Sequence, residues 1–130
     1  AFSAENPKEA RIEFRCPDPL CNPYLTYAVV FEAGLEGIEK KIDPGDPVDA
    51  NIYHISEADR KNLGIKTLPA SLEEALEEWS SDDICKRALG KETSEKYAQL
   101  KKQEWQEYQS QAAKDAISVT AWEVQKYLFA

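Results

Sequence analysis

The sequence is short of histidine, of positive charge and of long apolar runs, and each shortage argues against a class of protein. The one histidine, His54, has no second histidine or cysteine nearby, which makes it a poor metal ligand candidate. Lys and Arg number 16 against 24 Asp and Glu, and this net charge of −8 argues against nucleic acid or an anionic membrane as a partner. No apolar run approaches about 18 residues and no signal peptide opens the chain, so we expect a cytoplasmic protein.

Cysteine is also scarce and carries no recognisable metal spacing. Cys16, Cys21 and Cys85 are odd in number, which favours reduced thiols over a disulfide framework. With 42% hydrophobic and 31% charged residues, the composition is that of a folded, soluble piece with one modest core. We find no internal repeat and no low-complexity segment.

The most informative segment is R-I-E-F-R-C-P-D at residues 11–18. Its alternation predicts a strand over residues 9–16, in which Arg11, Glu13 and Arg15 share one face and apolar residues the other. Arginine recognises phosphate and carboxylate through its planar fork, and glutamate is a hard oxygen ligand for Mg²⁺, so this face suits a metal-bound polyphosphate and a carboxylate substrate. The alternative is a solvated face held by cross-strand ion pairs.

Beyond the strand the sequence predicts helices. Asn22 can cap a core helix that has Pro23 at its first position and ends near Lys41, before a connecting loop. Further starts are expected at Ser56, Ser71, Asp82 or Asp83, Thr93 and Thr120, with ends near Gly64 and Gly90. The helix from Thr93 would pack with an apolar face of Tyr97, Leu100, Trp105, Tyr108 and Ala112.

The order and spacing of several pieces resemble glutamine synthetase of the long-chain prokaryotic class. They are the segment 11–18, N-P-Y-L at 22–25, the stretches 33–49, 51–53 and 68–76, and the tail beginning Trp122-Glu123. The resemblance covers nearly the whole chain but only the C-terminal portion of the family's sequences. It therefore implies that residues 1–130 are the C-terminal part of the catalytic domain. The implied fold is α+β and mostly helical, with one or two strands of an antiparallel sheet (strand 9–16) followed by a helical region at 22–130.

The resemblance also implies a reaction, the ATP-dependent ligation of ammonia to L-glutamate through γ-glutamyl phosphate, giving glutamine, ADP and phosphate. Glu13 matches a ligand of Mg²⁺ or Mn²⁺, and Arg11 matches an arginine that contacts the ATP phosphates. Arg15 matches the catalytic arginine that contacts glutamate and the phosphoryl group in transfer. One metal ligand and two arginines cannot close a two-metal site, so we expect the 130 residues alone to be inactive.

Regulation and assembly are implied by the same resemblance. Tyr53 aligns with a tyrosine that one branch of the family adenylylates, although the sequence around it is more similar to the branch without this control. The tail 121–130 matches the element that joins two hexameric rings into a dodecamer. A γ-glutamyl-amine ligase of the same superfamily and a non-catalytic helical assembly module remain as alternatives.

Overall fold

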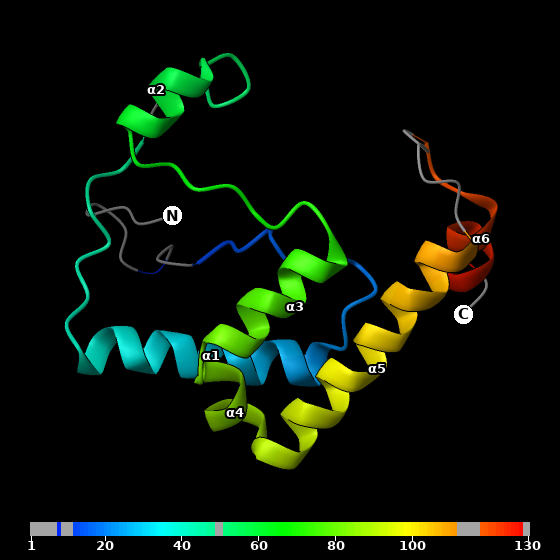
Figure 1. Ribbon diagram of the computed structural model, residues 1–130. Coiled ribbons are helices and arrows are strands. Elements are labelled where there is room, and N and C mark those ends of the chain that lie inside the picture. The colour runs from blue at the N-terminus through cyan, green and yellow to red at the C-terminus, as the bar shows by residue number, and fades with distance from the viewer. Residues whose placement is uncertain (1–7, 9–11, 49–50, 112–117, 129–130) are drawn as a thin grey trace.

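A computed structural model describes residues 8, 12–48, 51–111 and 118–128 of the chain (Figure 1). These residues form helices and connecting segments, and no strand occurs among them. The helices are α1 (Pro23–Glu39), α2 (Glu57–Asn62), α3 (Leu72–Ser81), α4 (Ile84–Leu89), α5 (Lys91–Gln111), α6 (Ala121–Glu123) and the π-helix η2 (Val124–Leu128). Within the described ranges, no helix has both the length and the apolarity needed to cross a membrane.

Side-chain caps start α1, α2, α3 and α6 where the sequence predicts them. The Asn22 carboxamide oxygen accepts the backbone N–H of Tyr24 at 3.0 Å, and Pro23 occupies the first position of α1. The Ser56 and Ser71 hydroxyls accept the N–H groups three residues on, each at 3.1 Å. Thr120 forms a reciprocal capping box with Glu123. These predictions are confirmed. They succeed because a helix cap is a hydrogen bond between one side chain and the first turn of its own helix, so it depends only on residues close together in the sequence.

The predicted start of the long helix at Thr93 is wrong. Gly90 ends α4 with φ 79°, and α5 begins directly afterwards at Lys91. Glycine adopts this positive φ without steric penalty, so one residue both ends α4 and allows α5 to begin. Thr93 therefore lies inside the first turn of α5 rather than before it.

The predicted strand 9–16 is not formed over its described part. Residues 12–16 are extended but make no backbone hydrogen bonds with another described segment. A strand needs a neighbour to pair its N–H and C=O groups, and none of the described residues supplies one. Residues 9–11, and with them Arg11, lie outside the described residues.

The helices make a chain of pairwise contacts. α1 packs on α4, both α3 and α4 pack on α5, and α6 packs on the far end of α5. In Figure 1, α3 and α5 run side by side with α4 at one end of the pair, and α2 stands apart from the other helices. Arg87 joins α4 to α1, since its guanidinium pairs with Glu32 at 2.9 Å and with Glu36 at 3.0 Å.

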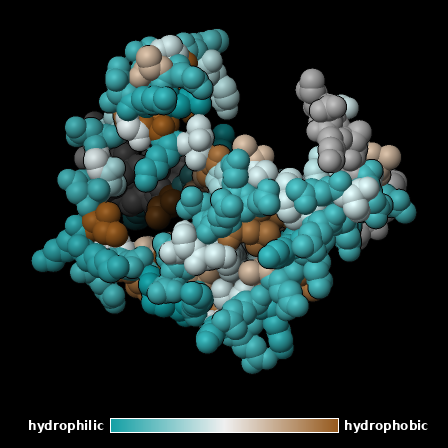
Figure 2. Space-filling model, viewed as in Figure 1, coloured by the Kyte–Doolittle hydropathy of each residue, from teal (hydrophilic) through white to brown (hydrophobic). Residues whose placement is uncertain are grey.

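The described residues bury little. Among them, only Cys85 and Ser94 are buried, and they are 6% and 2% exposed. The accessible surface is 11342 Å², whereas a folded monomer of 14.7 kDa exposes about 6,900 Å². The prediction that α1 is a core helix is therefore wrong for its outer positions, since Leu35 and Ile38 are 53% and 75% exposed. In Figure 2, apolar patches interrupt the hydrophilic surface between α3 and α5 and beside the hollow under α2.

Two aromatic clusters hold the helices together. Trp79 of α3 stacks on Tyr97 of α5 with ring centroids 4.8 Å apart, and its indole N–H donates to the buried Ser94 hydroxyl at 3.1 Å. At the other end of α5, the rings form a continuous series from α5 to η2. It runs Trp105, Tyr108, Trp122 and Tyr127, with successive centroids 5.4, 5.6 and 6.0 Å apart. The packing role predicted for these aromatics is confirmed, but Leu100 is 64% exposed and Ala112 lies outside the described residues.

Candidate functional site

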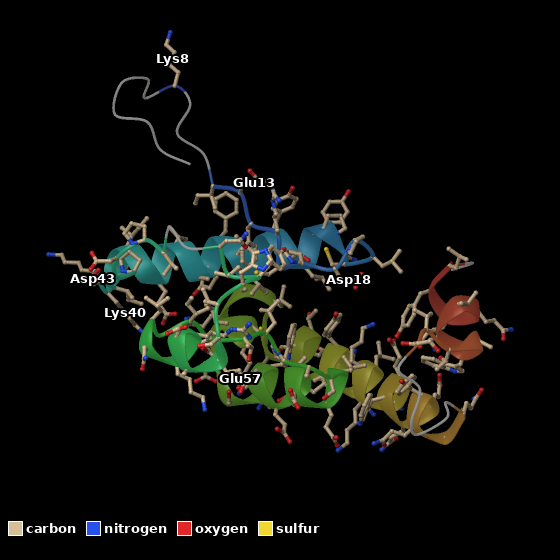
Figure 3. All side chains as sticks on the ribbon, turned by 90° about the horizontal axis from the view of Figure 1, so that it is seen from above. Lys8, Glu13, Asp18, Lys40, Asp43 and Glu57 are labelled. Atoms are coloured by element: carbon tan, nitrogen blue, oxygen red, sulfur yellow. The ribbon has the colours of Figure 1, made fainter. Side chains whose placement is uncertain are left out.

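Glu13 and Arg15 lie side by side on the extended segment before α1. Arg15 Nε donates to Glu13 Oε1 at 2.6 Å, and a second guanidinium nitrogen contacts the same oxygen. The structure thus brings together two of the three predicted site residues, as side-chain alternation with a period of two requires. Both are open to solvent, with side chains 50% and 84% exposed, and Figure 3 shows Glu13 on the segment beside α1. An ion pair so exposed contributes about 0–1 kcal/mol to stability, so it is available for other partners.

A tight turn connects this segment to α1. The Asp18 carboxylate accepts the Leu20 N–H at 2.7 Å, and the Asp18 carbonyl accepts the Cys21 N–H at 2.9 Å. Asn22 then caps α1 directly. The sequence P-D-P favours such a turn because proline restricts φ and aspartate bonds to the backbone two residues on. The turn therefore sets where the Glu13–Arg15 pair lies relative to α1.

Phe14 lies between Glu13 and Arg15 in the sequence and is itself 55% exposed. It lines a cavity of about 300 Å³ together with Cys16, Cys21 and residues of α1, α3 and α5. The helix residues are Leu25, Thr26, Val29, Val30, Trp79 and Tyr97, and Pro17 and the capping residue Asn22 complete the lining. The cavity is therefore open on the side of Phe14, and the exposed Glu13–Arg15 pair is not among the residues that line it.

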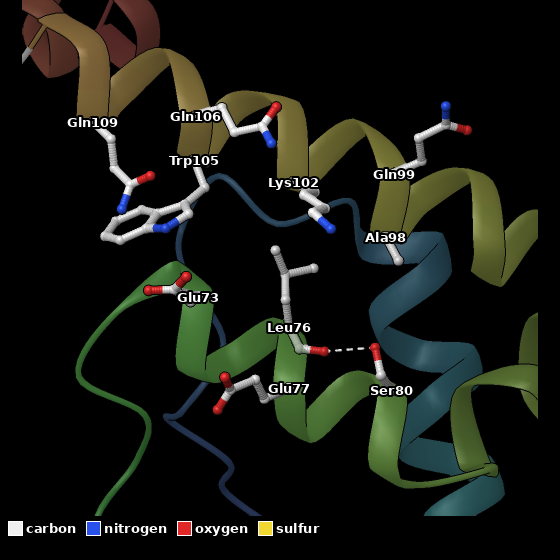
Figure 4. Close-up of a pocket in the computed structure, with 10 residues that line it drawn as sticks. All are labelled: Glu73, Leu76, Glu77, Ser80, Ala98, Gln99, Lys102, Trp105, Gln106 and Gln109. Carbon is white, nitrogen blue, oxygen red and sulfur yellow. Dashed lines mark hydrogen bonds between the residues drawn. The ribbon is translucent and has the colours of Figure 1, made fainter.

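A larger cavity lies elsewhere and contains none of the predicted site residues. It is a groove of about 490 Å³ between α3 and α5, shown in Figure 4. Leu76 and Trp105 supply its apolar wall, and Glu73, Glu77 and Lys102 supply charge. The Ser80 hydroxyl donates to the Leu76 carbonyl at 2.8 Å, an ordinary bond within the helix, and no base lies against it. The groove is therefore a space between helices rather than a catalytic centre.

The metal chemistry predicted for Glu13 is incomplete within the described part of the chain. There, no three His, Cys, Asp or Glu side chains come together as a group that could hold a metal ion. Glu13 alone supplies one carboxylate, and Mg²⁺ requires an octahedral set of oxygens. These residues therefore do not make up a metal site, and any such site would take its remaining ligands from other parts of a polypeptide.

Tyr53 and His54 lie on a turn before α2. The Tyr53 N–H donates to the Asn51 side chain at 3.1 Å, and the His54 N–H donates to the Asn51 carbonyl at 3.0 Å. Tyr53 is 90% exposed. Its hydroxyl is therefore accessible, and it stands apart from the Glu13–Arg15 pair in sequence and in contacts.

Shifted pKa values mark the helix contacts. A hydrogen bond from Lys40 lowers the pKa of Glu36, and Arg87 adds to the effect. Burial raises the pKa of the Cys85 thiol. Burial also raises the pKa of the Tyr127 hydroxyl, and the neighbouring Glu104 carboxylate adds to that shift. These groups stabilise or line helix junctions, and a thiol held protonated by burial is a poor nucleophile.

The tail folds back onto α5 over its described part, up to Leu128. The Tyr127 hydroxyl donates to Glu104, and Lys126 pairs with Glu107 at 3.0 Å. Burial alone would raise the pKa of Glu104, but its hydrogen bonds from Tyr127 and Lys101 lower it. Glu104 is not among the residues that the sequence pattern predicted. The available signal was its position one turn before Tyr108, on the aromatic face of the helix.

Comparison with known proteins agrees with these features. Residues 2–127 match the catalytic domain of glutamine synthetase. The chain is 48% identical over 127 residues to the glutamine synthetase of Pyrococcus furiosus, covering 94% of this chain and 29% of that protein. It is 47% identical over 118 residues to that of Methanosarcina mazei (91% and 25%) and 43% identical over 122 residues to that of Thermotoga maritima (94% and 26%).

The chain therefore belongs to the glutamine synthetase catalytic-domain family. It spans between a quarter and three tenths of the length of these relatives. The resemblance drawn from the sequence is confirmed, as is the predominance of helix.

Proposed function

We propose that this chain is the C-terminal part of the catalytic domain of a glutamine-forming ligase. The reaction joins ammonia to the side-chain carboxylate of L-glutamate through γ-glutamyl phosphate, and ATP supplies the phosphoryl group. The observation that carries the proposal is the pair Glu13 and Arg15, adjacent and exposed on one face of a segment within the region that matches the family.

Each charged residue has a role in this proposal. Arg15 contacts glutamate and the phosphoryl group in transfer, and Arg11, outside the described residues, contacts the ATP phosphates. Phosphoryl transfer depends mainly on positioning and on positive charge around the transferred group, which two guanidiniums provide. Lysine would keep the charge but lose the planar fork. Glu13 contributes one carboxylate to a divalent metal, Mg²⁺ or Mn²⁺, whose other ligands lie outside this chain.

Assembly and regulation belong to the same proposal. Ring-to-ring contacts through the tail 121–130 would join two hexamers into a dodecamer, supported by the aromatic content of that tail, Trp122 and Tyr127. Adenylylation of Tyr53 is supported only by its exposed side chain. Mass spectrometry of the protein from nitrogen-rich cultures tests this part of the proposal, and finding Tyr53 without an adenylyl group would contradict it.

Two alternatives have their own support. A γ-glutamyl-amine ligase would use the same arginines, because they handle phosphate and glutamate rather than the amine. A non-catalytic assembly module agrees with the small buried core and with the single metal ligand among the described residues.

The test is glutamate-dependent phosphate release from ATP and Mg²⁺, with ammonium, with a larger amine and with neither. It is run on the 130-residue chain and on a complete polypeptide in which the chain replaces the matching region of the Pyrococcus furiosus relative. Ammonium-dependent release by the complete polypeptide alone is expected. Phosphate release that requires the larger amine would favour the amine ligase. A complete polypeptide that folds but releases no phosphate under any of these conditions would favour the assembly module.

A further inference from the structure

Two of the three cysteines line one cavity at the turn that precedes α1. Cys16 and Cys21 are both wall residues of the cavity of about 300 Å³ that Phe14 also lines. Cys16 is exposed and Cys21 is partly exposed, whereas Cys85 is buried on α4, and all three are free thiols. Two accessible thiols therefore lie at one cavity, and the proposed reaction gives neither of them a role.

The turn between these two cysteines is already closed by hydrogen bonds. The Asp18 carbonyl accepts the Cys21 N–H at 2.9 Å, and the Asp18 carboxylate accepts the Leu20 N–H at 2.7 Å. A bond of the first kind is typical of a four-residue turn, whose first and last Cα atoms lie within about 7 Å of each other. Cys16 lies only two residues before this turn, and Figure 3 shows Asp18 near the start of α1.

Two prolines restrict the same short segment. Pro17 and Pro19 each hold φ at about −65°, so the segment has fewer conformations to lose when its ends are joined. Only four residues separate the two thiols, and closing a loop costs less entropy when the loop is shorter. Cys85 lies 64 residues beyond Cys21 and is buried on another helix. The turn therefore favours a bond between Cys16 and Cys21 over a bond of either with Cys85.

We propose that Cys16 and Cys21 form a reversible disulfide when the protein meets hydrogen peroxide, and that this bond inactivates the reaction site beside it. The exposed Cys16 thiol, as its thiolate, attacks one peroxide oxygen, the O–O bond breaks, and a sulfenic acid and one water are formed. The Cys21 thiol then attacks the sulfenic sulfur, which forms the S–S bond and releases a second water. Together the two thiols lose two electrons and two protons, and the peroxide is reduced to two waters.

The bond acts on the site through Arg15. Arg15 directly precedes Cys16 in the chain, and its guanidinium pairs with Glu13. To form the bond, Cys16 Sγ turns towards Cys21 and draws its own backbone towards the start of α1, so Arg15 is displaced with it. A displacement of about 1 Å in a group that positions a substrate can cost about a hundredfold in rate. The loss of activity rests on the proposed function, whereas the formation of the disulfide does not.

The experiment uses the complete polypeptide that carries this chain in place of the matching region of the Pyrococcus furiosus relative. It is treated with hydrogen peroxide, its remaining thiols are blocked with N-ethylmaleimide in denaturant, and it is digested with trypsin. Because trypsin cleaves after Lys and Arg, Cys16 and Cys21 are released together in peptide 16–40, and Cys85 is released in peptide 67–86. We expect peptide 16–40 to be unblocked and lighter than its reduced form by two hydrogen atoms. Cys85 should be blocked as a free thiol.

Ammonium-dependent phosphate release should follow the state of this bond. Oxidation should lower it roughly tenfold or more, and dithiothreitol should restore it. Cys16→Ser and Cys21→Ser should each keep the untreated rate, lose the reversible inactivation and give no lighter peptide, because one thiol cannot form the bond. Cys85→Ala is the matched control, since it removes a thiol that does not line the cavity, and it should change neither result.

Several results would overturn the proposal. Peptide 16–40 that stays fully blocked after peroxide, or that gains only oxygen atoms, would mean that no disulfide forms. A dimer on a non-reducing gel that Cys16→Ser removes would place the bond between two chains. A disulfide that leaves phosphate release unchanged would overturn the inactivation.

Failure of the proposed function gives a different result. A folded polypeptide that forms the disulfide in peptide 16–40 but releases no phosphate before oxidation would contradict the reaction and confirm the modification site.

Discussion

The contact between Trp79 and Ser94 offers a sharp test of what holds α3 to α5. The indole N–H donates to the Ser94 hydroxyl at 3.1 Å, and Ser94 is only 2% exposed. Ser94→Ala removes the acceptor and leaves a part-buried N–H unpaired, which costs about 1–3 kcal/mol. Alanine has a higher helix propensity than serine, so the substitution also stabilises α5 by roughly 0.5 kcal/mol at most. The expected net loss in the free energy of unfolding is about 0.5–2.5 kcal/mol.

Urea unfolding followed by tryptophan fluorescence measures this loss. With a denaturant slope of about 1–3 kcal/mol per M, the midpoint should fall by roughly 1 M or somewhat less. Ser110→Ala is the matched control, because Ser110 lies on the same helix and its hydroxyl bonds only to the exposed backbone of its own helix at Glu107. Its effect should stay within about 0.5 kcal/mol.

A double-mutant cycle separates the hydrogen bond from other effects of Ser94. Trp79→Phe removes the N–H donor and keeps an aromatic ring against Tyr97. If the bond carries the loss, Ser94→Ala should cost little in the Trp79→Phe background, with a coupling of about 1 kcal/mol. A coupling near zero, or equal losses for Ser94→Ala and Ser110→Ala, would refute the reasoning.

Two further predictions concern ionised groups at helix junctions. Lys40 has the largest influence on the lowered pKa of Glu36, so Lys40→Gln should raise that pKa more than Arg87→Gln does, as measured by carboxyl NMR titration. Because the folded pKa lies below the ordinary 4.5, Glu36 stabilises the fold above pH 4.5, and this contribution is lost as the pH falls through the folded pKa. Tyr127→Phe removes a hydrogen bond to Glu104, so it should raise the pKa of Glu104 and speed hydrogen exchange in η2, at a cost of about 0.5–1.5 kcal/mol. An unchanged Glu104 titration in Tyr127→Phe, or a larger shift of Glu36 in Arg87→Gln, would contradict these assignments.

Local features of the fold could be predicted from the sequence because they depend on a few neighbouring residues. Asn22, Ser71 and Thr120 cap helices through hydrogen bonds to their own first turns, which side-chain chemistry makes recognisable. The adjacency of Glu13 and Arg15 likewise follows from alternation along an extended chain. The start of α5 was missed because the positive φ of Gly90 replaces a side-chain cap.

Burial could not be predicted in the same way. Helical spacing shows that Phe31, Leu35 and Ile38 share a face, but it does not show whether anything covers that face, and here they are exposed. The strand predicted at 9–16 is not confirmed, for a related reason. Alternation along the sequence indicates a single strand, but a strand forms only when a second one pairs with it, and the described residues 12–16 have no such partner among the described residues. The contact between Tyr127 and Glu104 joins residues 23 positions apart, beyond any local pattern.

The most direct test of the proposed function is the effect of Glu13→Ala on glutamine formation by the complete polypeptide, with Glu39→Ala, an exposed glutamate at the end of α1, as the control. Loss of one metal ligand should lower turnover and metal affinity by orders of magnitude while the thermal midpoint stays unchanged, because the Glu13–Arg15 pair is exposed and adds little stability. Glu39→Ala should keep full activity. Glutamine formation by Glu13→Ala at the unaltered rate, with the same dependence on Mg²⁺, would contradict the assignment of this segment to the reaction site.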